Sequence, residues 1–205
     1  IEIRKIESDR SIIMSHNIKF DLKLETDRLF LLAGERVYTY KDTIKQGMLN
    51  SVDRLKEWVS FFNHNFDDFK VTDFINKTTD INLNKQFLRY FIFDKETENF
   101  VGSIVLQDIN LRLPSCEIGY WMVNSGLGKG FATEAIKYVT KYLVEEHGFV
   151  RIEAYIDVQN TKSIETIERC GYELEGTLKN SDLSSDGSKL INEVLYAVAT
   201  PVYFK

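Results

Sequence analysis

Cysteine, proline and histidine are all scarce in this sequence of 205 residues. Two cysteines exclude a disulfide framework, two prolines exclude a proline-rich linker, and three histidines show no metal-ligand spacing. The sequence also lacks any run of about 18 apolar residues, the length that a membrane-spanning helix needs. We therefore expect a cytoplasmic protein that contains no metal and has no membrane partner.

A surplus of positive charge is missing as well. The chain carries 26 Lys and Arg residues against 31 Asp and Glu residues, which gives a net charge of −5. Nucleic-acid-binding proteins normally show the opposite balance, so we expect no nucleic-acid partner. The acidic balance is compatible with a basic protein or a cationic amine as substrate, although net charge does not say where the acids gather.

The length and the hydrophobic content of 43% fit one soluble domain with a substantial core. We expect an N-terminal extension over residues 1–23 and one domain over residues 24–205. No internal repeat or low-complexity tract divides the domain.

Glycine is infrequent overall, but three glycines alternate within residues 124–135, in the run NSGLGKGFATEA. This run follows a strand-like segment, 117–123, and precedes a helical pattern. Glycine tolerates the backbone angles that turn successive N–H groups toward one anion, and the following helix adds its own free N–H groups. The spacing alone fits either a phosphate-binding loop or an ordinary turn before a helix.

Two nucleotide-binding motifs do not match this run. A Walker loop needs Ser or Thr after Gly-Lys, whereas Gly130 follows Lys129 here. A dinucleotide fold places its glycines early, with an acidic residue about 20 positions later. The run lies past the middle of the chain, and the acids at that distance fall inside the helical pattern.

Periodicity predicts the elements around the loop. A helix is expected over 131–147 with Gly148 as its left-handed cap, a strand from 152 to 158, a short helix over 161–170 and a strand from 172 to 178. Earlier and later apolar patterns predict strands near 18–20, 28–32, 87–93, 100–106, 189–199 and 202–204, with helical spacing over 50–83. The polar segment 94–99 is expected to be a hairpin turn. Hairpins beside a crossover helix indicate an α/β fold with a mixed sheet.

This order of elements resembles the GNAT acetyltransferase superfamily, and within it the RimJ/RimL-type enzymes that acetylate protein N-termini. The resemblance covers roughly residues 24–196. It is carried by the phrases LETDRL (24–29), EIGYW (117–121), GKGFATEA (128–135), NTKS (160–163) and GYELEG (171–176).

The resemblance implies a single-domain GNAT fold with about six to seven strands and about four helices. It also implies direct acetyl transfer from acetyl-CoA to a primary amine in a ternary complex, by a monomer or homodimer. The expected acceptor is the α-amine of a protein N-terminus. The alternatives are a small amine, such as an aminoglycoside, polyamine or amino sugar, and a catalytically silent acyl-CoA-binding domain.

The same resemblance implies that the cofactor is bound mainly by main-chain groups. N–H groups of the glycine loop would bind the pyrophosphate, and those around Met122 and Val123 would pair with the pantetheine and polarise the thioester carbonyl. The family has Gln or Arg where this chain has Leu127, so one polar contact is missing. The expected cofactor-binding residues are Met122, Val123, Gly128, Lys129, Gly130, Phe131, Ala132, Thr133 and Asn160.

Ser163 is the first of three candidates for the chemistry; the other two are acids. Many GNAT enzymes protonate the leaving thiolate with a tyrosine seven residues after the asparagine, but that position is Ile167 here. RimL-type enzymes resemble this chain in having a serine at the position of Ser163, which could donate a hydrogen bond to the thiolate or could be a plain first-turn serine. Asn160 could likewise contact the pantetheine or cap the short helix.

The base that accepts the amine proton is expected to be Glu117 or Asp182. Glu117 begins the strand that leads into the glycine loop, and Asp182 aligns with an acid that RimL-type enzymes place after the strand following the short helix. An α-amine has a pKa near 8, so a modest base suffices. We favour Glu117, because a strand holds a side chain more rigidly than a loop.

Overall fold

An eight-stranded sheet runs through the protein in the computed structural model, which describes residues 18–63, 66–79 and 87–200. The spatial order is β1-β2-β3-β4-β5-β6-β8-β7, and every neighbouring pair is antiparallel except β5 and β6. The strands are β1 (Lys23–Glu25), β2 (Leu29–Leu32), β3 (Leu88–Asp94), β4 (Phe100–Asn110), β5 (Ser115–Met122), β6 (Arg151–Asp157), β7 (Glu173–Leu183) and β8 (Leu190–Ala199).

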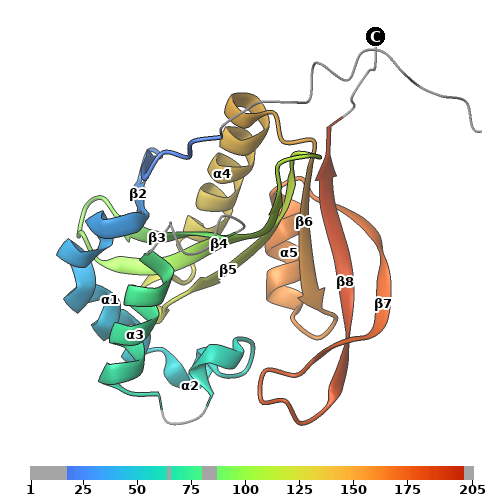
Figure 1. Ribbon diagram of the computed structural model, residues 1–205. Helices are drawn as coiled ribbons and strands as arrows, with labels where there is room; N and C mark the ends of the chain where they lie inside the picture. The colour runs from blue at the N-terminus through green and yellow to red at the C-terminus, as the bar shows by residue number, and fades with distance from the viewer. Residues whose placement is uncertain (1–17, 64–65, 80–86, 201–205) are drawn as a thin grey trace, which may run out of the picture.

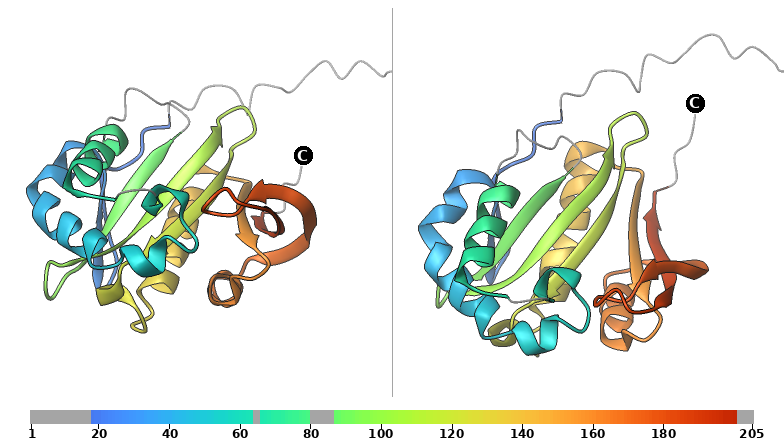
Figure 2. Two further views of the ribbon diagram at one scale, coloured as in Figure 1. Left: turned by 90° about the horizontal axis from the view of Figure 1, so that it is seen from below. Right: turned by 60° about the horizontal axis from the view of Figure 1, so that its bottom comes forward.

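Helices cover both faces of the sheet (Figures 1 and 2). One layer contains α1 (Lys41–Leu49) and α3 (Asp68–Thr79), and the other contains α4 (Phe131–His147) and α5 (Thr161–Arg169). Short elements connect them: α2 (Val52–Leu55) and the 3₁₀ turns Gly34–Tyr40, Ser60–Phe62 and Asn124–Gly126.

Alternation along the strands builds a separate core under each helical layer. On β5, Ile118 and Met122 pack with α4 in a mostly aliphatic core, whereas Trp121 faces the opposite side. There it joins an aromatic core under α1 and α3 that includes Phe91 and Phe100. β3 and most of β4 are buried on both faces, and β5 is held in place by its pairing with β4.

The two parallel strands of the sheet stay paired over only a short stretch. β5 and β6 pair at three positions, ending at Glu117 opposite Glu153. Beyond this point β5 continues toward the glycine loop while β6 pairs with β8 on its other side. The carboxyl-terminal parts of β5 and β6 therefore separate, and the crossover helix α4 lies between them along the chain.

Most of the predicted elements are confirmed to within one or two residues, including α4 and its left-handed Gly148 cap. Residues 18–20 are not a strand, and the first strand is β1. β1 has only three residues, of which Leu24 alone is buried, so its sequence is too short to show a period of two. β7 runs on to Leu183, so Asp182 belongs to a strand and not to the loop expected for it. The sheet has eight strands where six to seven were expected, and the prediction for 202–204 lies outside the described residues.

Within the described ranges, none of the helices combines the length and apolarity needed to cross a membrane.

Candidate active site

The glycine loop after β5 has the backbone angles that only glycine adopts without strain. Gly128 and Gly130 have φ values of 72° and 76°, and Gly130 is the residue before α4. A Cβ atom on Gly128 would meet nothing within 4 Å, so this side of the loop is open. In the described part of the chain, the N–H groups of residues 128–133 find no recorded acceptor. The loop and the first turn of α4 therefore present a row of free donors, as an anion site requires.

The loop is fixed from behind by a cluster on the β1–β2 turn. Arg28 donates from Nη1 to the carbonyl oxygen of Lys129 at 2.9 Å and pairs with Glu134, in the first turn of α4, at 2.6 Å. Thr26 Oγ1 and the Arg28 N–H also donate to Glu134, at 2.6 and 3.0 Å. Burial would raise the pKa of Glu134, but these bonds outweigh it and lower the pKa. The carboxylate is thereby held charged at the positive end of the helix dipole.

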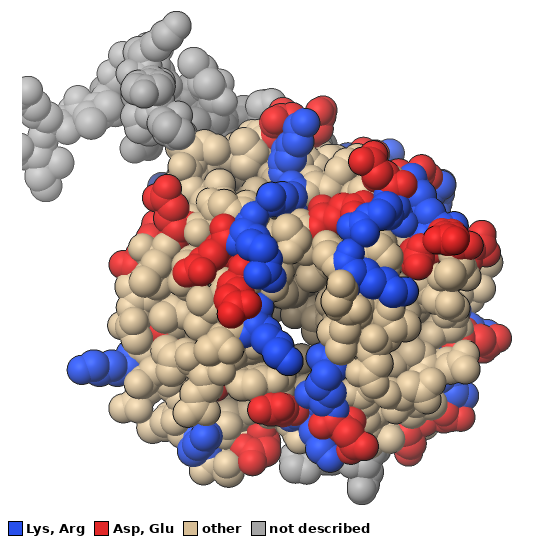
Figure 3. Space-filling view, turned by 180° about the vertical axis from the view of Figure 1, so that it is seen from behind, with Lys and Arg blue, Asp and Glu red and all other residues tan. Residues whose placement is uncertain are grey.

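Two cations lie beside Phe131, the first residue of α4. Seen from behind, Lys and Arg side chains stand on both sides of a hollow in the protein (Figure 3). Lys129 in the loop and Arg28 behind it both lie over the ring of Phe131, at 5.5 and 4.9 Å from its centre. Leu127, where the family has a polar residue, is 45% exposed. An anion bound at this loop would therefore rely on main-chain donors and on these two cations.

Main-chain groups at the end of β5 point toward the gap between β5 and β6. Val123 N–H bonds to Val101, and hydrogen-bonded residues alternate along an antiparallel pair. Tyr120 and Met122 therefore direct their main-chain groups away from β4. The Met122 carbonyl accepts a bond from Arg54 on α2, which also donates to Asn124 at 3.0 Å.

The main-chain groups of Val123, a predicted cofactor contact, have partners within the fold. Its N–H donates to Val101 and its carbonyl accepts from Gly126 N–H, both at 2.9 Å. Both main-chain groups of Val123 are thus used inside the fold. The pairing prediction at this point of the chain therefore rests on the N–H of Met122, since the Met122 carbonyl accepts from Arg54, and the geometry adds Tyr120, whose main-chain groups point away from β4.

The amino end of α5 faces the same gap from the β6 side. Asn160 caps this helix, because its side-chain oxygen accepts from Ser163 N–H at 3.2 Å. The cap uses the oxygen alone, so the Asn160 NH₂ group is still a possible donor to a pantetheine carbonyl. Ile167 is fully buried, as a residue on the core side of α5.

Ser163 makes a second contact that the sequence did not predict. Its hydroxyl donates to the Tyr120 hydroxyl at 2.8 Å, and Tyr120 in turn donates to the Ser163 carbonyl at 2.9 Å. Burial raises the pKa of Tyr120 to about 12, although the bond from Ser163 lowers it. Tyr120 therefore stays protonated at neutral pH and ties β5 to α5 across the gap.

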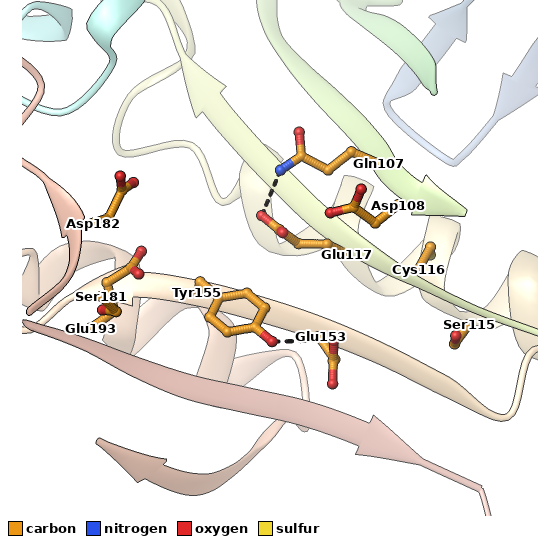
Figure 4. Close-up of a pocket in the computed structure, with 10 residues that line it drawn as sticks. All are labelled: Gln107, Asp108, Ser115, Cys116, Glu117, Glu153, Tyr155, Ser181, Asp182 and Glu193. Carbon is orange, nitrogen blue, oxygen red and sulfur yellow. Dashed lines mark hydrogen bonds between the residues drawn. The ribbon is translucent and has the colours of Figure 1, made fainter. Parts of the chain in front are cut away.

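A pocket of about 350 Å³ lies beside the last paired residues of β5 and β6. Its lining contains five carboxylates and no lysine or arginine. These side chains come from β4, β5, β6, β7 and β8, and Figure 4 shows Gln107, Asp108 and Glu117 across from Asp182, Ser181 and Glu193. The lining residues are Gln107, Asp108, Ser115, Cys116, Glu117, Glu153, Tyr155, Ser181, Asp182 and Glu193.

Glu117 is the most perturbed carboxylate of this pocket. Burial raises its pKa to about 6, and the charges of Asp108, Glu193 and Glu153 add to the effect. A hydrogen bond from Gln107 Nε2, at 2.7 Å, acts in the opposite direction (Figure 4). Such a group accepts protons near neutral pH, which suits a general base.

Asp182 lines the same pocket from the other side, on β7, where the ladder with β8 is irregular between Leu178 and Asp182. One of its oxygens accepts from Leu183 N–H at 2.7 Å. The structure thus brings both predicted base candidates to one pocket. Glu117 is the half-buried candidate, and Asp182 is exposed on the edge strand.

Sequence reasoning missed the other acids of the pocket. Glu153 and Tyr155 alternate with the buried residues of β6, which was a readable signal of one common face. Asp108 lies at the irregularity between Gln107 and Asn110 in the β4–β5 ladder, and Glu193 lies on β8, so only the sheet order places them in one pocket with Glu117. Cys116 also lines the pocket, but burial raises its thiol pKa to about 12, so no reactive thiolate is present.

Residues 39–173 match the family model described as an acetyltransferase (GNAT) domain. The chain belongs to the GNAT acetyltransferase family. The match spans the glycine loop, the gap and both of its flanking helices, and the family assignment confirms the fold class and the enzyme class expected from the sequence.

Similar proteins include members of the expected subgroup. The chain is 28% identical to an "Uncharacterized N-acetyltransferase p20" of Bacillus licheniformis, over 82% of this chain and 98% of that protein. It is 29% identical to a "Ribosomal-protein-serine acetyltransferase" of Escherichia coli, over 54% and 60% of the two chains. A solved structure of RimL, a ribosomal L7/L12 alpha-N-protein acetyltransferase in complex with coenzyme A, superposes with a TM-score of 0.74 at 17% identity, covering 85% of this chain and 95% of that one.

Proposed function

We propose that this GNAT enzyme transfers the acetyl group of acetyl-CoA to a primary amine in the acidic pocket, and that the amine is the α-amine of a protein N-terminus. The observation that carries the proposal is Glu117, a half-buried carboxylate with a pKa raised to about 6 at the point where β5 and β6 separate. A proton acceptor with this pKa is matched to an amine whose own pKa is near 8.

The cofactor is proposed to bind between the separating strands β5 and β6 and along the glycine loop. The free N–H groups of residues 128–133 face an open side of the loop and suit the pyrophosphate. The main-chain groups of Tyr120 and Met122 suit the pantetheine amides, which would add to the sheet as a further strand. The RimL structure with coenzyme A supports this placement by its fold.

The residues divide the chemistry between the two faces of β5. Glu117 points into the acidic pocket, and it accepts the amine proton either directly or through water. The amine nitrogen then forms its bond to the thioester carbon, and the bond from that carbon to sulfur breaks. Main-chain N–H groups at the end of β5 stabilise the oxyanion, and Ser163, beyond the gap, stabilises the departing thiolate by a hydrogen bond.

The acceptor is proposed to be cationic because the pocket is acidic. The carboxylates of the pocket attract an ammonium group and its attached chain. Burial first, and then the charges of Asp108, Glu193 and Glu153, hold the pKa of Glu117 up until that positive charge arrives. The named ribosomal-protein relative and the RimL structure support a protein N-terminus. A polyamine is the second candidate, because its several positive charges would match the several carboxylates of the pocket.

An acceptor screen tests the proposal. Release of CoA would be followed by free-thiol detection with Ser- and Ala-initiated peptides, the same peptides with blocked α-amines, spermidine, free lysine and aminoglycosides. We expect the free N-terminal peptides to react fastest and their blocked forms to be inert. Turnover of small amines alone would replace the first candidate by the second. Binding of acetyl-CoA without any transfer would instead favour a silent acyl-CoA-binding domain.

A further inference from the structure

We propose that Tyr120 is a positioning residue for the leaving group: it directs the Ser163 hydroxyl toward the departing sulfur by taking over as hydrogen-bond donor to Ser163 Oγ. The inference rests on the proposed function, which places the thioester in the gap between β5 and β6. It assigns a role to a phenol on the sheet, on the opposite side of the gap from α5.

The contact between the two hydroxyls limits what Ser163 can do alone. A serine hydroxyl has one proton, and Ser163 directs that proton to Tyr120 at 2.8 Å. In this arrangement Ser163 has no donor left for a thiolate. Tyr120 has also committed its own proton, to the Ser163 carbonyl at 2.9 Å.

A concerted rotation resolves this conflict without moving the heavy atoms. If Tyr120 turns its proton from the Ser163 carbonyl to Ser163 Oγ, the same 2.8 Å contact persists in the reverse direction. The Ser163 proton is then free to point at sulfur. A hydroxyl that accepts one hydrogen bond is a stronger donor of the next, so the chain Tyr120–Ser163–sulfur is cooperative.

The pair donates hydrogen bonds and gives up no proton. The pKa of Tyr120 is about 12, well above that of an ordinary thiol near 8.5, so the phenol stays neutral when the thiolate forms. The carbon–sulfur electron pair leaves on sulfur, and the thiolate is stabilised by Ser163 until solvent protonates it. The other groups that act on the pKa of Tyr120 are Cys170, which raises it, and Arg169, which lowers it.

The rigid surroundings of Tyr120 favour this role. Tyr120 lies on a central strand and packs against the core under α4, so its ring has little freedom. Ser163 is fixed at the amino end of α5 by the Asn160 cap. The position on α5 where many GNAT enzymes carry the tyrosine is a buried isoleucine, Ile167. A phenol nevertheless reaches the gap, supplied by the strand.

The first test measures the thiolate directly and needs no acceptor. Coenzyme A bound to the protein is titrated between about pH 6 and 9.5 by thiolate absorbance, with desulfo-coenzyme A as the blank. Wild type should lower the pKa of the bound thiol, and Tyr120→Phe should raise it again by about one unit, the effect of a weakened hydrogen bond to a charged atom. Burial raises the pKa values of Cys116 and Cys170 to about 12 and 11, so the protein thiols do not titrate in this range.

Two further proteins separate positioning from structure. Ser163→Ala should raise the thiol pKa as Tyr120→Phe does, and the double variant should raise it no further. Tyr172→Phe is the matched control, because Tyr172 is a buried phenol bonded to Thr140 at 2.8 Å in the same core. It should leave the thiol pKa unchanged. If Tyr120→Phe does not fold, 3-fluorotyrosine at position 120 keeps the shape and makes a stronger donor, which should lower the thiol pKa further.

The outcomes distinguish this inference from the proposed function. An unchanged thiol pKa in Tyr120→Phe, or additive effects of Tyr120→Phe and Ser163→Ala, overturns the role of Tyr120 even if amines are acetylated. A lowered thiol pKa that depends on both hydroxyls supports the role even if no amine tested is acetylated. With an active acceptor, kcat should fall about three- to tenfold in Tyr120→Phe while KM for acetyl-CoA stays nearly constant.

Discussion

The glycine loop and the acidic pocket hold their charges in opposite ways. Behind the loop, Glu134 is paired with Arg28 and bonded by Thr26, and its pKa is lowered. In the pocket, Glu117 lies among other carboxylates without a lysine or arginine in the lining, and its pKa is raised. A paired carboxylate fixes a backbone, whereas an uncompensated one is available to a substrate. The opposite pKa shifts distinguish Glu134, which orders the loop, from Glu117, which is proposed to react.

The largest effect is expected from replacing Glu117, the proposed base. Glu117→Gln should lower kcat/KM about 10²–10³-fold, since a positioned base commonly contributes this much. The deficit should be largest between about pH 6 and 8, where Glu117 is charged and most of the amine is still protonated, and it should shrink below pH 6 as Glu117 itself takes up a proton. The kcat/KM of wild type should fall as the pH drops through about 6, the pKa of Glu117, and the pH profile of Glu117→Gln should lack this fall. Asp182→Asn is the matched control, and a larger loss there would make Asp182 the base.

The glycine loop can be broken without touching the pocket. Gly130→Val places a β-branched residue at a φ of 76° and should weaken acetyl-CoA binding about tenfold or more by turning the loop donors away from the pyrophosphate. Gly148→Val is the control at the other end of the same helix, with a φ of 66° and open space around its Cβ. Both should lose similar stability in thermal melts. Calorimetry that shows equal acetyl-CoA affinities in the two folded variants would remove the anion site.

Breaking the Arg28–Glu134 ion pair behind the glycine loop should have a smaller effect on acetyl-CoA binding. Arg28→Met removes the bond to the Lys129 carbonyl and the partner of Glu134, so the loop loses order while its N–H donors remain. We expect acetyl-CoA affinity to fall about three- to tenfold, with kcat nearly unchanged, because one charge-assisted contact behind the site is lost. Lys77→Met, which breaks an ion pair on α3, is the control and should have no effect on binding. A fall in kcat alone would contradict an ordering role.

The smallest effect is on stability. The pKa of Glu117 is raised to about 6 from an ordinary value of 4.5, so its charged form is disfavoured by folding. The contribution of this group to stability is therefore present below about pH 4.5 and is lost as the pH rises through about 6. Glu117→Gln should melt at the same temperature as wild type near pH 4 and about 1–3 °C higher above pH 7. A melting difference that does not vary with pH would contradict the raised pKa.

The elements around the loop could be predicted because their signals are local. Helical spacing and Gly148 define α4, and alternation defines β6. For residues 33–49 no element was predicted, and the helical spacing predicted over 50–83 is confirmed only in part, as α2, a 3₁₀ turn and α3, whose apolar residues pack into the aromatic core. Short elements have too few residues to establish a period, so tertiary packing decides them.

The amino-acid sequence by itself determined the family, the glycine loop and the two candidate bases, because each depends on a residue type at a fixed spacing along the chain. The tertiary structure decided which groups meet. Strand register gathered Glu153, Glu193 and Asp182 around Glu117, and it set the pKa of that carboxylate by burial and like charge. The packing of α5 beside β5 brought Ser163 to Tyr120, 43 residues away in the chain. Electrostatics and hydrogen bonding act through space, so the reactivity of a residue cannot be predicted from its neighbours in sequence.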